Sequence, residues 1–316
     1  MHDFISIGSS LVDMFVHSDD FSMKKLNGEN LFSIQGDKVE MESFVVRAGG
    51  GAANTAVGFS RLGFKAAIIS ETGRDDFSEV IVRNLQKDSV DTSLIVKEKQ
   101  EVTGGSVILV GQNGRRTVMV HRGAASMLDP FDIPPFWFSK ARWVHLSSIS
   151  GRLETLKRIF ELVKMNPELR LSWNPGKSEL KLIAEGKIKA DDIPCLILFL
   201  NDKEWKMIEK QQEKLIEEIP QIVITKGAEG GEVYIHGKKQ LKFLGAQEKS
   251  VDDTGAGDAF ATGYVAAQYL NMQPKTSVEW GVRNAGSVIR YFGAQTGLLE
   301  RQRIEGNNGS SFARLR

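Results

Sequence analysis

The chain has 316 residues, 41% of them hydrophobic, and a formal net charge of +1 at pH 7. That length and composition suffice for a large α/β core, built as one domain or as one domain with a small appendage. Because 41 basic and 40 acidic residues are interspersed, we expect neither a nucleic-acid-binding surface nor a basic membrane-binding face. The chain has a single cysteine, Cys195, which excludes an intramolecular disulfide. We expect neither a signal peptide nor a membrane span, and therefore predict a cytoplasmic protein.

The first part of the chain mixes strands and helices. Short apolar runs predict strands, and amphipathic stretches predict helices. The strands are expected at 4–8, 44–46 and 66–70, and the helices at 52–62 and 77–87. Two alternating stretches, 106–110 and 117–120, flank Asn113-Gly114, which is a strong signal for a β-hairpin.

From Trp143 onward, apolar strands alternate with amphipathic helices. The strands are expected at 143–146, 169–173, 196–200 and 222–225, and the helices at 153–164, 179–185 and 203–217. This alternation predicts an α/β fold with a mostly parallel sheet covered by helices on both faces. A hairpin around Gly237 and two helices, 258–270 and 275–292, are expected to complete it.

Three half-polar stretches, at about 11–17, 31–46 and 103–121, do not fit a parallel sheet buried on both faces. They predict a small antiparallel sheet that is inserted in two pieces, at about 11–46 and 95–122. The predicted organisation is therefore one domain over residues 1–304, with these two insertions. Residues 305–316 are polar and predict a flexible tail.

The most informative motif is Asp252-Asp253-Thr254-Gly255-Ala256-Gly257-Asp258, directly before a predicted helix. Small residues let successive backbone N–H groups approach an anion at the positive end of that helix. Asp258 would lie in the first helical turn. A carboxylate beside an anion site can accept a hydroxyl proton while the N–H groups stabilise charge on a transferred group.

This motif resembles the second signature of the ribokinase, or PfkB-type, family of carbohydrate and nucleoside kinases. The resemblance extends from about Asp3 to Leu299. It implies a ribokinase-like doubly wound sheet whose small antiparallel sheet forms a lid over a sugar. It also implies transfer of the γ-phosphoryl group of ATP to a sugar hydroxyl. Asp258 would be the base, and the amides of Gly255, Ala256 and Gly257 would surround the transferring phosphoryl group.

A second glycine run, Gly49-Gly50-Gly51-Ala52-Ala53-Asn54, opens another predicted helix. It resembles the first signature of the family, which implies that Gly50, Gly51 and Asn54 bind the sugar. Asp13 matches an aspartate that binds sugar hydroxyls in the family, although taken alone it would read more readily as a solvated loop acid than as a sugar ligand.

Polar residues at the ends of the later strands match the nucleotide and metal positions of the family. Asn201-x-x-Glu204 implies that Glu204 organises Mg²⁺ through water, while the same residues also suit a helix capping box. Asp252 matches a ligand of a monovalent cation such as K⁺ in some members. The residues expected to bind nucleotide are Asn174, Asn201, Thr225, Gly227, Gly230 and Asn284. Asn174 fits a plain Asn-Pro-Gly turn equally well.

Several alternatives remain open at this point. A nucleoside kinase of the adenosine type would need an aromatic wall, which Phe15, Phe32 and Phe44 could supply. Gly49-x-Gly51-x-x-Asn54 after a strand, with Glu71 further on, keeps a NAD-dependent oxidoreductase as a distant reading. A non-catalytic sugar-binding regulator is the third alternative. ATP and ADP are both open as the phosphoryl donor, and the resemblance suggests a homodimer through the lid.

Overall fold

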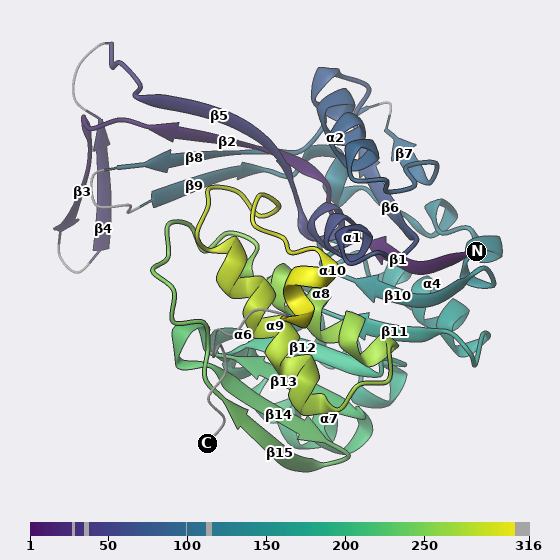
Figure 1. Cartoon of the computed structure of the whole chain (residues 1–316). Helices are drawn as coiled ribbons and strands as arrows, with labels where there is room; N and C mark the ends of the chain where they lie inside the picture. The colour runs from purple at the N-terminus through teal and green to yellow at the C-terminus, as the bar shows by residue number, and fades with distance from the viewer. Residues whose placement is uncertain (27–28, 35–37, 99, 112–115, 307–316) are drawn as a thin grey trace.

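The computed structural model describes residues 1–26, 29–34, 38–98, 100–111 and 116–306. Helices cover both faces of a large sheet, and a smaller sheet projects from this body (Figure 1). The strands of the large sheet are β1 (His2–Ile7), β6 (Ala66–Thr72), β7 (Ile95–Lys97), β10 (Ala141–Leu146), β11 (Arg170–Trp173), β12 (Ile197–Asn201), β13 (Gln221–Thr225), β14 (Gly231–Ile235) and β15 (Lys238–Phe243). The helices are α1 (Gly51–Arg61), α2 (Asp76–Lys87), α3 (Pro135–Phe138), α4 (Leu153–Lys164), α5 (Lys177–Ala184), α6 (Asp202–Met207), α7 (Gln212–Glu218), α8 (Ala256–Tyr269), α9 (Pro274–Val288) and α10 (Arg301–Glu305).

The large sheet has the strand order β15-β14-β13-β12-β11-β10-β1-β6-β7. Every neighbouring pair from β7 to β13 is parallel, and the β13–β14 and β14–β15 pairs are antiparallel. The predicted α/β fold with a mostly parallel sheet is therefore confirmed. Parallel strands place all their carboxyl ends at one edge, where such sheets bind ligands.

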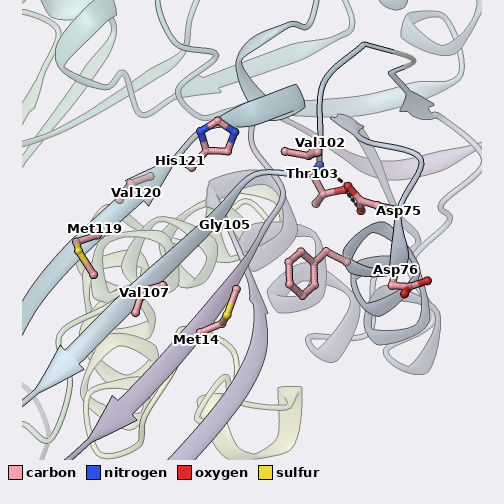
Figure 2. Close-up of a pocket in the computed structure, with 11 residues that line it drawn as sticks. Met14, Asp75, Asp76, Val102, Thr103, Gly105, Val107, Met119, Val120 and His121 are labelled. Atoms are coloured by element: carbon pink, nitrogen blue, oxygen red, sulfur yellow. Dashed lines mark hydrogen bonds between the residues drawn. The ribbon is translucent and has the colours of Figure 1, made fainter. Parts of the chain in front are cut away.

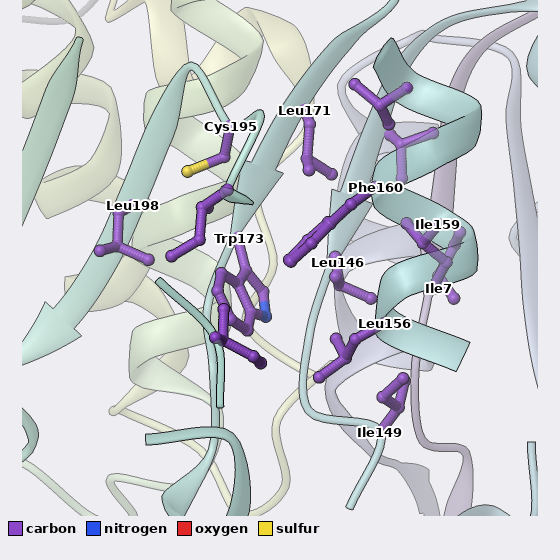
Figure 3. Close-up of a cluster of buried hydrophobic side chains, with 14 of the residues drawn as sticks. Ile7, Leu146, Ile149, Leu156, Ile159, Phe160, Leu171, Trp173, Cys195 and Leu198 are labelled. Carbon is purple, nitrogen blue, oxygen red and sulfur yellow. The ribbon is translucent and has the colours of Figure 1, made fainter. Parts of the chain in front are cut away.

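Successive residues of the central strands point to opposite faces, and each face has its own core. Val144 and Leu146 of β10 pack with helix α4, whereas Trp143 packs with helices α8 and α9. Figure 3 shows the first of these clusters, in which the rings of Phe160 and Trp173 meet edge to face at 5.4 Å. Cys195 is only 3% exposed and lies in the same cluster, as a core thiol.

The small sheet, which we call the lid, has the order β5-β2-β8-β9. Its strands are β2 (Leu11–His17), β5 (Ser43–Gly49), β8 (Gly105–Val110) and β9 (Arg116–His121). The pairs β2–β5 and β8–β9 are antiparallel, as predicted, and a parallel β2–β8 pair joins the two inserted pieces. The turn at Asn113-Gly114 lies outside the described residues. A further hairpin, β3 (Phe21–Leu26) and β4 (Glu29–Ile34), crosses the far end of the lid (Figure 1).

Two predicted helices differ from the structure. The helix expected at 203–217 is divided into α6 and α7, because the chain turns at Ile208 to bury its side chain. The helix expected at 275–292 ends at Val288, where the carbonyl of Ile289 accepts hydrogen bonds from the N–H groups of Val251 and Asp252. Residues 307–316 of the predicted tail lie outside the described part, and the division into one domain with a tail stays a prediction. In the described ranges, no helix combines the length and apolarity that crossing a bilayer requires.

Candidate active site

The two glycine motifs meet at the carboxyl edge of the large sheet. Asn54, in the first turn of α1, donates a hydrogen bond from Nδ2 to Oδ2 of Asp258, in the first turn of α8, at 2.8 Å. A Cβ atom added to Gly51 would lie 3.7 Å from the other oxygen, Oδ1 of Asp258. The structure therefore brings Asp258 together with two of the predicted sugar-binding residues, although about two hundred residues separate the motifs.

The carboxyl group of Asp258 has a raised pKa. Burial raises its pKa to about 6, the hydrogen bond from Asn54 opposes that rise, and the negative charge of Glu204 adds to it. Asp258 is thus ionised at neutral pH, with a pKa near the working range. A general base is most effective under those conditions.

The loop before α8 can receive an anion. Gly255 is the N-cap of the helix and has a φ of +76°, a left-handed conformation that glycine adopts without strain. The N–H of Ala256 donates to the carbonyl of Asp253 at 3.2 Å. In the described part of the chain, no hydrogen bond occupies the N–H groups of Gly255 and Gly257. Two of the three predicted N–H groups are thus available at the positive end of a 14-residue helix.

The glycines before α1 permit close backbone contacts. Gly50 has a φ of +97°, and a Cβ atom there would lie 2.5 Å from the carbonyl oxygen of Ser9. A Cβ atom on Gly51 would lie 2.7 Å from Cβ and Oγ of Ser147, at the end of β10. Larger residues at these two positions would push α1 away from β1 and β10, and Asn54 away from Asp258.

Asp13 lies on the lid and is not a solvated loop acid. It is 6% exposed, on strand β2, and its Oδ1 accepts a hydrogen bond from the hydroxyl of Ser106 on β8. A Cβ atom on Gly49 would lie 2.1 Å from its Oδ2, so a larger residue there would displace the carboxylate. Burial raises the pKa of Asp13 to about 6, while Ser106 opposes the rise and Asp252 adds to it. Asp13, Ser106 and Val120 are aligned across β2, β8 and β9, on one face of the lid.

Three predicted nucleotide-binding residues follow neighbouring strands. Asn174 comes directly after β11, Asn201 ends β12 and Thr225 ends β13. Nδ2 of Asn174 donates to the carbonyl of Phe199 at 3.1 Å, and Asn201 pairs with Thr225 across the sheet. These side chains therefore share one stretch of the carboxyl edge.

The loop after β13 contains two of the predicted glycines. Gly227 and Gly230 have φ values of +57° and +96°, and a Cβ atom on Gly230 would lie 1.8 Å from the carbonyl oxygen of Phe243. Only glycine fits at position 230 without moving β15. The loop is therefore held close to the same carboxyl edge.

Glu204 serves as a helix cap, and its charge also acts on Asp258. Its Oε2 accepts from the N–H of Asn201 at 2.8 Å, and Oδ1 of Asn201 accepts from the N–H of Glu204 at 2.9 Å. Burial raises the pKa of Glu204, and its charge acts on Asp258. Among the described residues, no group of three His, Cys, Asp or Glu could hold a metal ion directly. This arrangement fits Mg²⁺ held through water near one carboxylate.

Asn284 is not brought to the cleft. It is fully buried between α8 and α9, where Nδ2 donates to the carbonyl of Ala259 at 2.8 Å and Oδ1 accepts from the N–H of Leu299 at 3.0 Å. Both polar groups of its amide are thus used inside the protein. Any contribution to nucleotide binding would be indirect, through the position of α8.

Asp252 is 2% exposed and surrounded by donors. Its Oδ1 accepts from the N–H and hydroxyl of Thr254 and is 2.7 Å from Nη1 of Arg116, on lid strand β9. Its Oδ2 accepts from the N–H of Gly293 at 3.0 Å. This carboxylate shapes the turn that leads to Gly255 and ties the lid to the body.

A cavity of about 700 Å³ lies on the other face of the lid (Figure 2). Met14, Val107 and Met119 line it from the lid, and Phe77 lines it from helix α2. Met14 follows Asp13 on the same strand and therefore points to the opposite face. Asp75, at its rim, already accepts from the N–H and hydroxyl of Thr103 at 2.7 and 2.6 Å. The cavity is apolar and is not part of the site around Asp258.

The structure agrees with comparisons to known proteins. The family model described as pfkB family carbohydrate kinase matches residues 1–301. The chain belongs to this family. Fructokinase of Escherichia coli is 27% identical over 284 residues, covering 81% of this chain and 90% of the relative.

Solved structures share the fold at lower identity. A putative ribokinase II from E. coli, in complex with ATP and Mg²⁺, has a TM-score of 0.76 at 19% identity and covers 96% of this chain and 98% of its own. Adenosine kinase from Sinorhizobium meliloti has a TM-score of 0.75 at 20% identity, with 96% and 99% covered. These likenesses confirm the ribokinase-like fold of this pfkB-family chain. The distant reading as a NAD-dependent oxidoreductase receives no support.

Proposed function

We propose that this pfkB-family kinase transfers the γ-phosphoryl group of ATP to a hydroxyl group of a small sugar. The observation that carries the proposal is the contact of Asn54 with Asp258, in the same motif as the N–H groups of Gly255 and Gly257, which bind no other group among the described residues. It combines a base with an anion site, which phosphoryl transfer to an alcohol requires. These residues also argue against a non-catalytic sugar-binding regulator, which would have no use for the base.

The chemical step follows from this arrangement. The sugar would lie between the carboxyl edge of the sheet and the lid, held by Asp13, Gly50, Gly51 and Asn54. Its hydroxyl proton moves to Asp258 as the oxygen attacks the γ-phosphorus and the bond to the β-phosphate oxygen breaks. The N–H groups of the Gly255 loop, with the helix α8 dipole, stabilise negative charge on the phosphoryl oxygens.

ATP and Mg²⁺ are proposed on the family membership and on the structural relative that contains both. Asn174, Asn201 and Thr225 line the carboxyl edge, where the nucleotide would bind, and Gly227 and Gly230 form the loop beside it. Mg²⁺ would be held through water near Glu204 and would supply positive charge to the phosphates. ADP as the donor stays open, as does the cytoplasmic location predicted from the sequence.

A sugar fits the lid better than a nucleoside does. Phe15 is 3% exposed and packs against Phe292, with ring centroids 6.1 Å apart. Phe44 pairs with Val16 and lies on the face opposite to Asp13, and Phe32 packs against Phe21 at 5.5 Å. Phe15 shares the face of Asp13 but its ring is buried, and the other two rings lie elsewhere, so none of the three is free to stack on a base beside Asp13. Val120, 52% exposed, lies in line with Asp13 and suits the apolar edge of a small sugar.

The test is the consumption of ATP with Mg²⁺ across pentoses, hexoses, sugar acids, sugar phosphates and nucleosides. We expect kcat/KM to be highest for one of the free sugars. A clear preference for a nucleoside would mean that the lid rearranges to stack a base, and would support the adenosine-type alternative.

Asp13→Asn is expected to weaken sugar binding. The substitution keeps the shape of the side chain but removes the charge that would accept hydrogen bonds from two sugar hydroxyls, each worth roughly 1.5–3 kcal/mol. KM for the sugar should rise about 10- to 100-fold, with KM for ATP little changed. Ser106→Ala is the matched control, since it removes the partner of Asp13 and should cost less. Equal KM values for the sugar in wild type and Asp13→Asn would exclude this role.

A monovalent cation at Asp252 is the remaining cofactor prediction, and it competes with Arg116. The guanidinium already neutralises a carboxylate that is 2% exposed. We therefore expect wild-type activity to be equal in potassium and choline chloride. In Arg116→Met the buried charge loses its partner, so activity should fall several-fold and recover partly with K⁺. Strong stimulation of the wild type by K⁺ would instead support a cation at Asp252.

A homodimer through the lid also stays a proposal. The face of the lid opposite to Asp13 is apolar and exposed at Phe44 and Met119, which are 56% and 52% accessible. Exposed apolar patches on sheets of this kind are typical of interfaces between subunits. Light scattering on the purified chain would decide between monomer and dimer.

A further inference from the structure

A chain of buried side-chain amides leads to the catalytic base. Nδ2 of Asn84, on α2, donates to Oε1 of Gln295 at 2.6 Å, and Nε2 of Gln295 donates to Oδ1 of Asn54 at 3.1 Å. Nδ2 of Asn54 then donates to Asp258. Gln295 is 7% exposed and Asn54 is 4% exposed, so the bond between them is buried from water, whereas Asn84 is half-buried. No motif in the sequence marks Gln295.

The direction of this chain follows from its end. An ionised carboxylate only accepts hydrogen bonds, so Asn54 must present its NH₂ group to Asp258 and its oxygen to Gln295. Gln295 must then present its NH₂ group to Asn54 and its oxygen to Asn84. An amide could otherwise turn by half a rotation at little steric cost, because its oxygen and nitrogen are of similar size. The orientation of Asn54 is thus fixed from both ends, because its NH₂ group donates to Asp258 while its oxygen accepts from Gln295.

That orientation distinguishes the two oxygens of Asp258. The NH₂ group of Asn54 occupies Oδ2, whereas Oδ1 is the oxygen of Asp258 that lies closest to Gly51, 3.7 Å from where a Cβ atom on that glycine would be. The substrate hydroxyl would arrive on the side of Gly51, so its proton would move to Oδ1. The hydrogen bond on Oδ2 favours the ionised form of the base.

We propose that Gln295 is a positioning residue that holds the amide of Asn54 in one orientation, so that Oδ1 of Asp258 is the proton acceptor. This inference rests on the proposed function for its catalytic meaning, but the hydrogen-bond chain can be tested without turnover. The main chain of Gln295 is itself anchored, since its backbone carbonyl accepts from Nη1 of Arg61 at 2.6 Å. Arg61 in turn pairs with Asp88 at 2.7 Å, at the end of α2.

Two charged groups act on this hydrogen-bond chain of Asn84, Gln295, Asn54 and Asp258. The negative charge of Glu204 acts on Asp258, and the positive charge of Arg61 lies at the main chain of Gln295. A substitution at position 295 that keeps both groups in place therefore reports on the orientation of Asn54. Gln295→Met is such a change, because it keeps the size of the side chain and adds no charge.

The experiment is a titration of the Asp258 carboxyl group by ¹³C NMR on protein labelled at aspartate, with Asp258→Asn used for assignment. We expect the pKa of Asp258 to be near 6 in the wild type. Gln295→Met releases the amide of Asn54 and should raise this pKa by about 0.5–1 unit, as expected for a weakened hydrogen bond to a charge. Gln295→Glu should raise it further, because the new carboxylate draws the NH₂ group of Asn54 away from Asp258.

Gln268→Met is the matched control. Gln268 lies on α8, as Asp258 does. Its side-chain NH₂ group donates to the carbonyl of Met272 and to the hydroxyl of Ser277, and it has no hydrogen bond to Asn54 or Gln295 among the described residues. Its substitution should lower Tm without changing the pKa of Asp258. If the charged variant does not fold, Gln295→Met decides the question alone.

Equal pKa values for Asp258 in wild type and Gln295→Met would overturn the proposal and leave Gln295 a purely structural residue. A raised pKa of Asp258 in Gln295→Met supports the positioning role of Gln295 even if no sugar is phosphorylated. The positioning role and the proposed function can therefore fail separately. If a sugar is phosphorylated, the acid limb of the plot of kcat against pH should shift to higher pH in Gln295→Met. The shift should equal the rise in the pKa of Asp258, and KM for ATP should be unchanged.

Discussion

Asp258→Asn is expected to abolish most of the sugar kinase activity while leaving the fold intact. Asparagine keeps the size of the side chain, but its amide cannot accept the hydroxyl proton from the substrate. A missing general base typically lowers kcat by about 10²- to 10⁴-fold, whereas KM for ATP should change little because Asp258 is proposed to act on the sugar hydroxyl. Steady-state kinetics with the best sugar measure both quantities.

The stability of this variant provides its own control. Burial raises the pKa of Asp258 above its value in an unfolded chain, so the ionised form destabilises the folded state. This cost appears as the pH rises through the interval between the two pKa values, from about 4 to about 6. At neutral pH, Asp258→Asn should therefore have the same Tm as the wild type or a higher one. Full activity in a folded Asp258→Asn protein would exclude Asp258 as the base.

The pH profile of the wild type should show the same carboxyl groups. Activity requires ionised Asp258 and, for sugar binding, ionised Asp13, and burial raises the pKa of each to about 6. kcat/KM should therefore fall steeply below about pH 6, with a slope that approaches two protons. In Asp13→Asn the limb should flatten to a single proton. A limb centred near pH 4 would mean that neither carboxyl group is perturbed.

Gly255→Ala is expected to cause the second large loss, through the anion-binding loop. The added methyl group would lie 2.2 Å from Cβ and 2.8 Å from Cα of Ala294, and φ at this position is +76°. Since Ala294 is itself 2% exposed and cannot move into solvent, the loop must shift instead. A displacement of about 1 Å at groups that stabilise the transition state commonly costs on the order of 10²-fold in kcat.

Gly186→Ala is the matched control for the backbone conformation. Gly186 has a φ of +69°, after helix α5, and an added Cβ atom would meet no heavy atom within 4 Å. Both substitutions impose the strain of a left-handed alanine, about 1 kcal/mol of stability. Only Gly255→Ala should lose activity, while Gly186→Ala should lower Tm alone. Similar kcat values for the two variants would show that the Gly255 loop does not need its present position.

The fold was largely predictable because its core strands are short apolar runs between amphipathic helices. The run at 196–200 could only be a buried strand, and it forms β12 as Ile197–Asn201. The hairpin β3–β4 was not predicted, since its half-polar residues carry no strong alternation. Helix α9 ends at Val288, and the N–H groups of Val251 and Asp252 donate to the carbonyl of the next residue, Ile289, a long-range contact that no local pattern reveals.

The site was predictable where glycines and acids occur in one motif, and less so where single residues come from the lid. Asp258 and Asn54 belong to such motifs, and the structure brings them into contact. Ser106 and Arg116 lie on strands whose register determines which residues face Asp13 and Asp252, and sequence spacing alone does not give that register. Gln295 has no signal of its own, because its role arises from the orientation of the amide of Asn54.

The most direct test of sugar phosphorylation compares wild type and Asp258→Asn across the same panel of sugars and nucleosides, with ATP and Mg²⁺, and identifies the product by mass spectrometry. We expect one sugar to gain a phosphoryl group with the wild type and to gain it at least about 10²-fold more slowly with Asp258→Asn. If no sugar is phosphorylated, or if both proteins act at the same rate, the proposed function of the Asp258 site is contradicted.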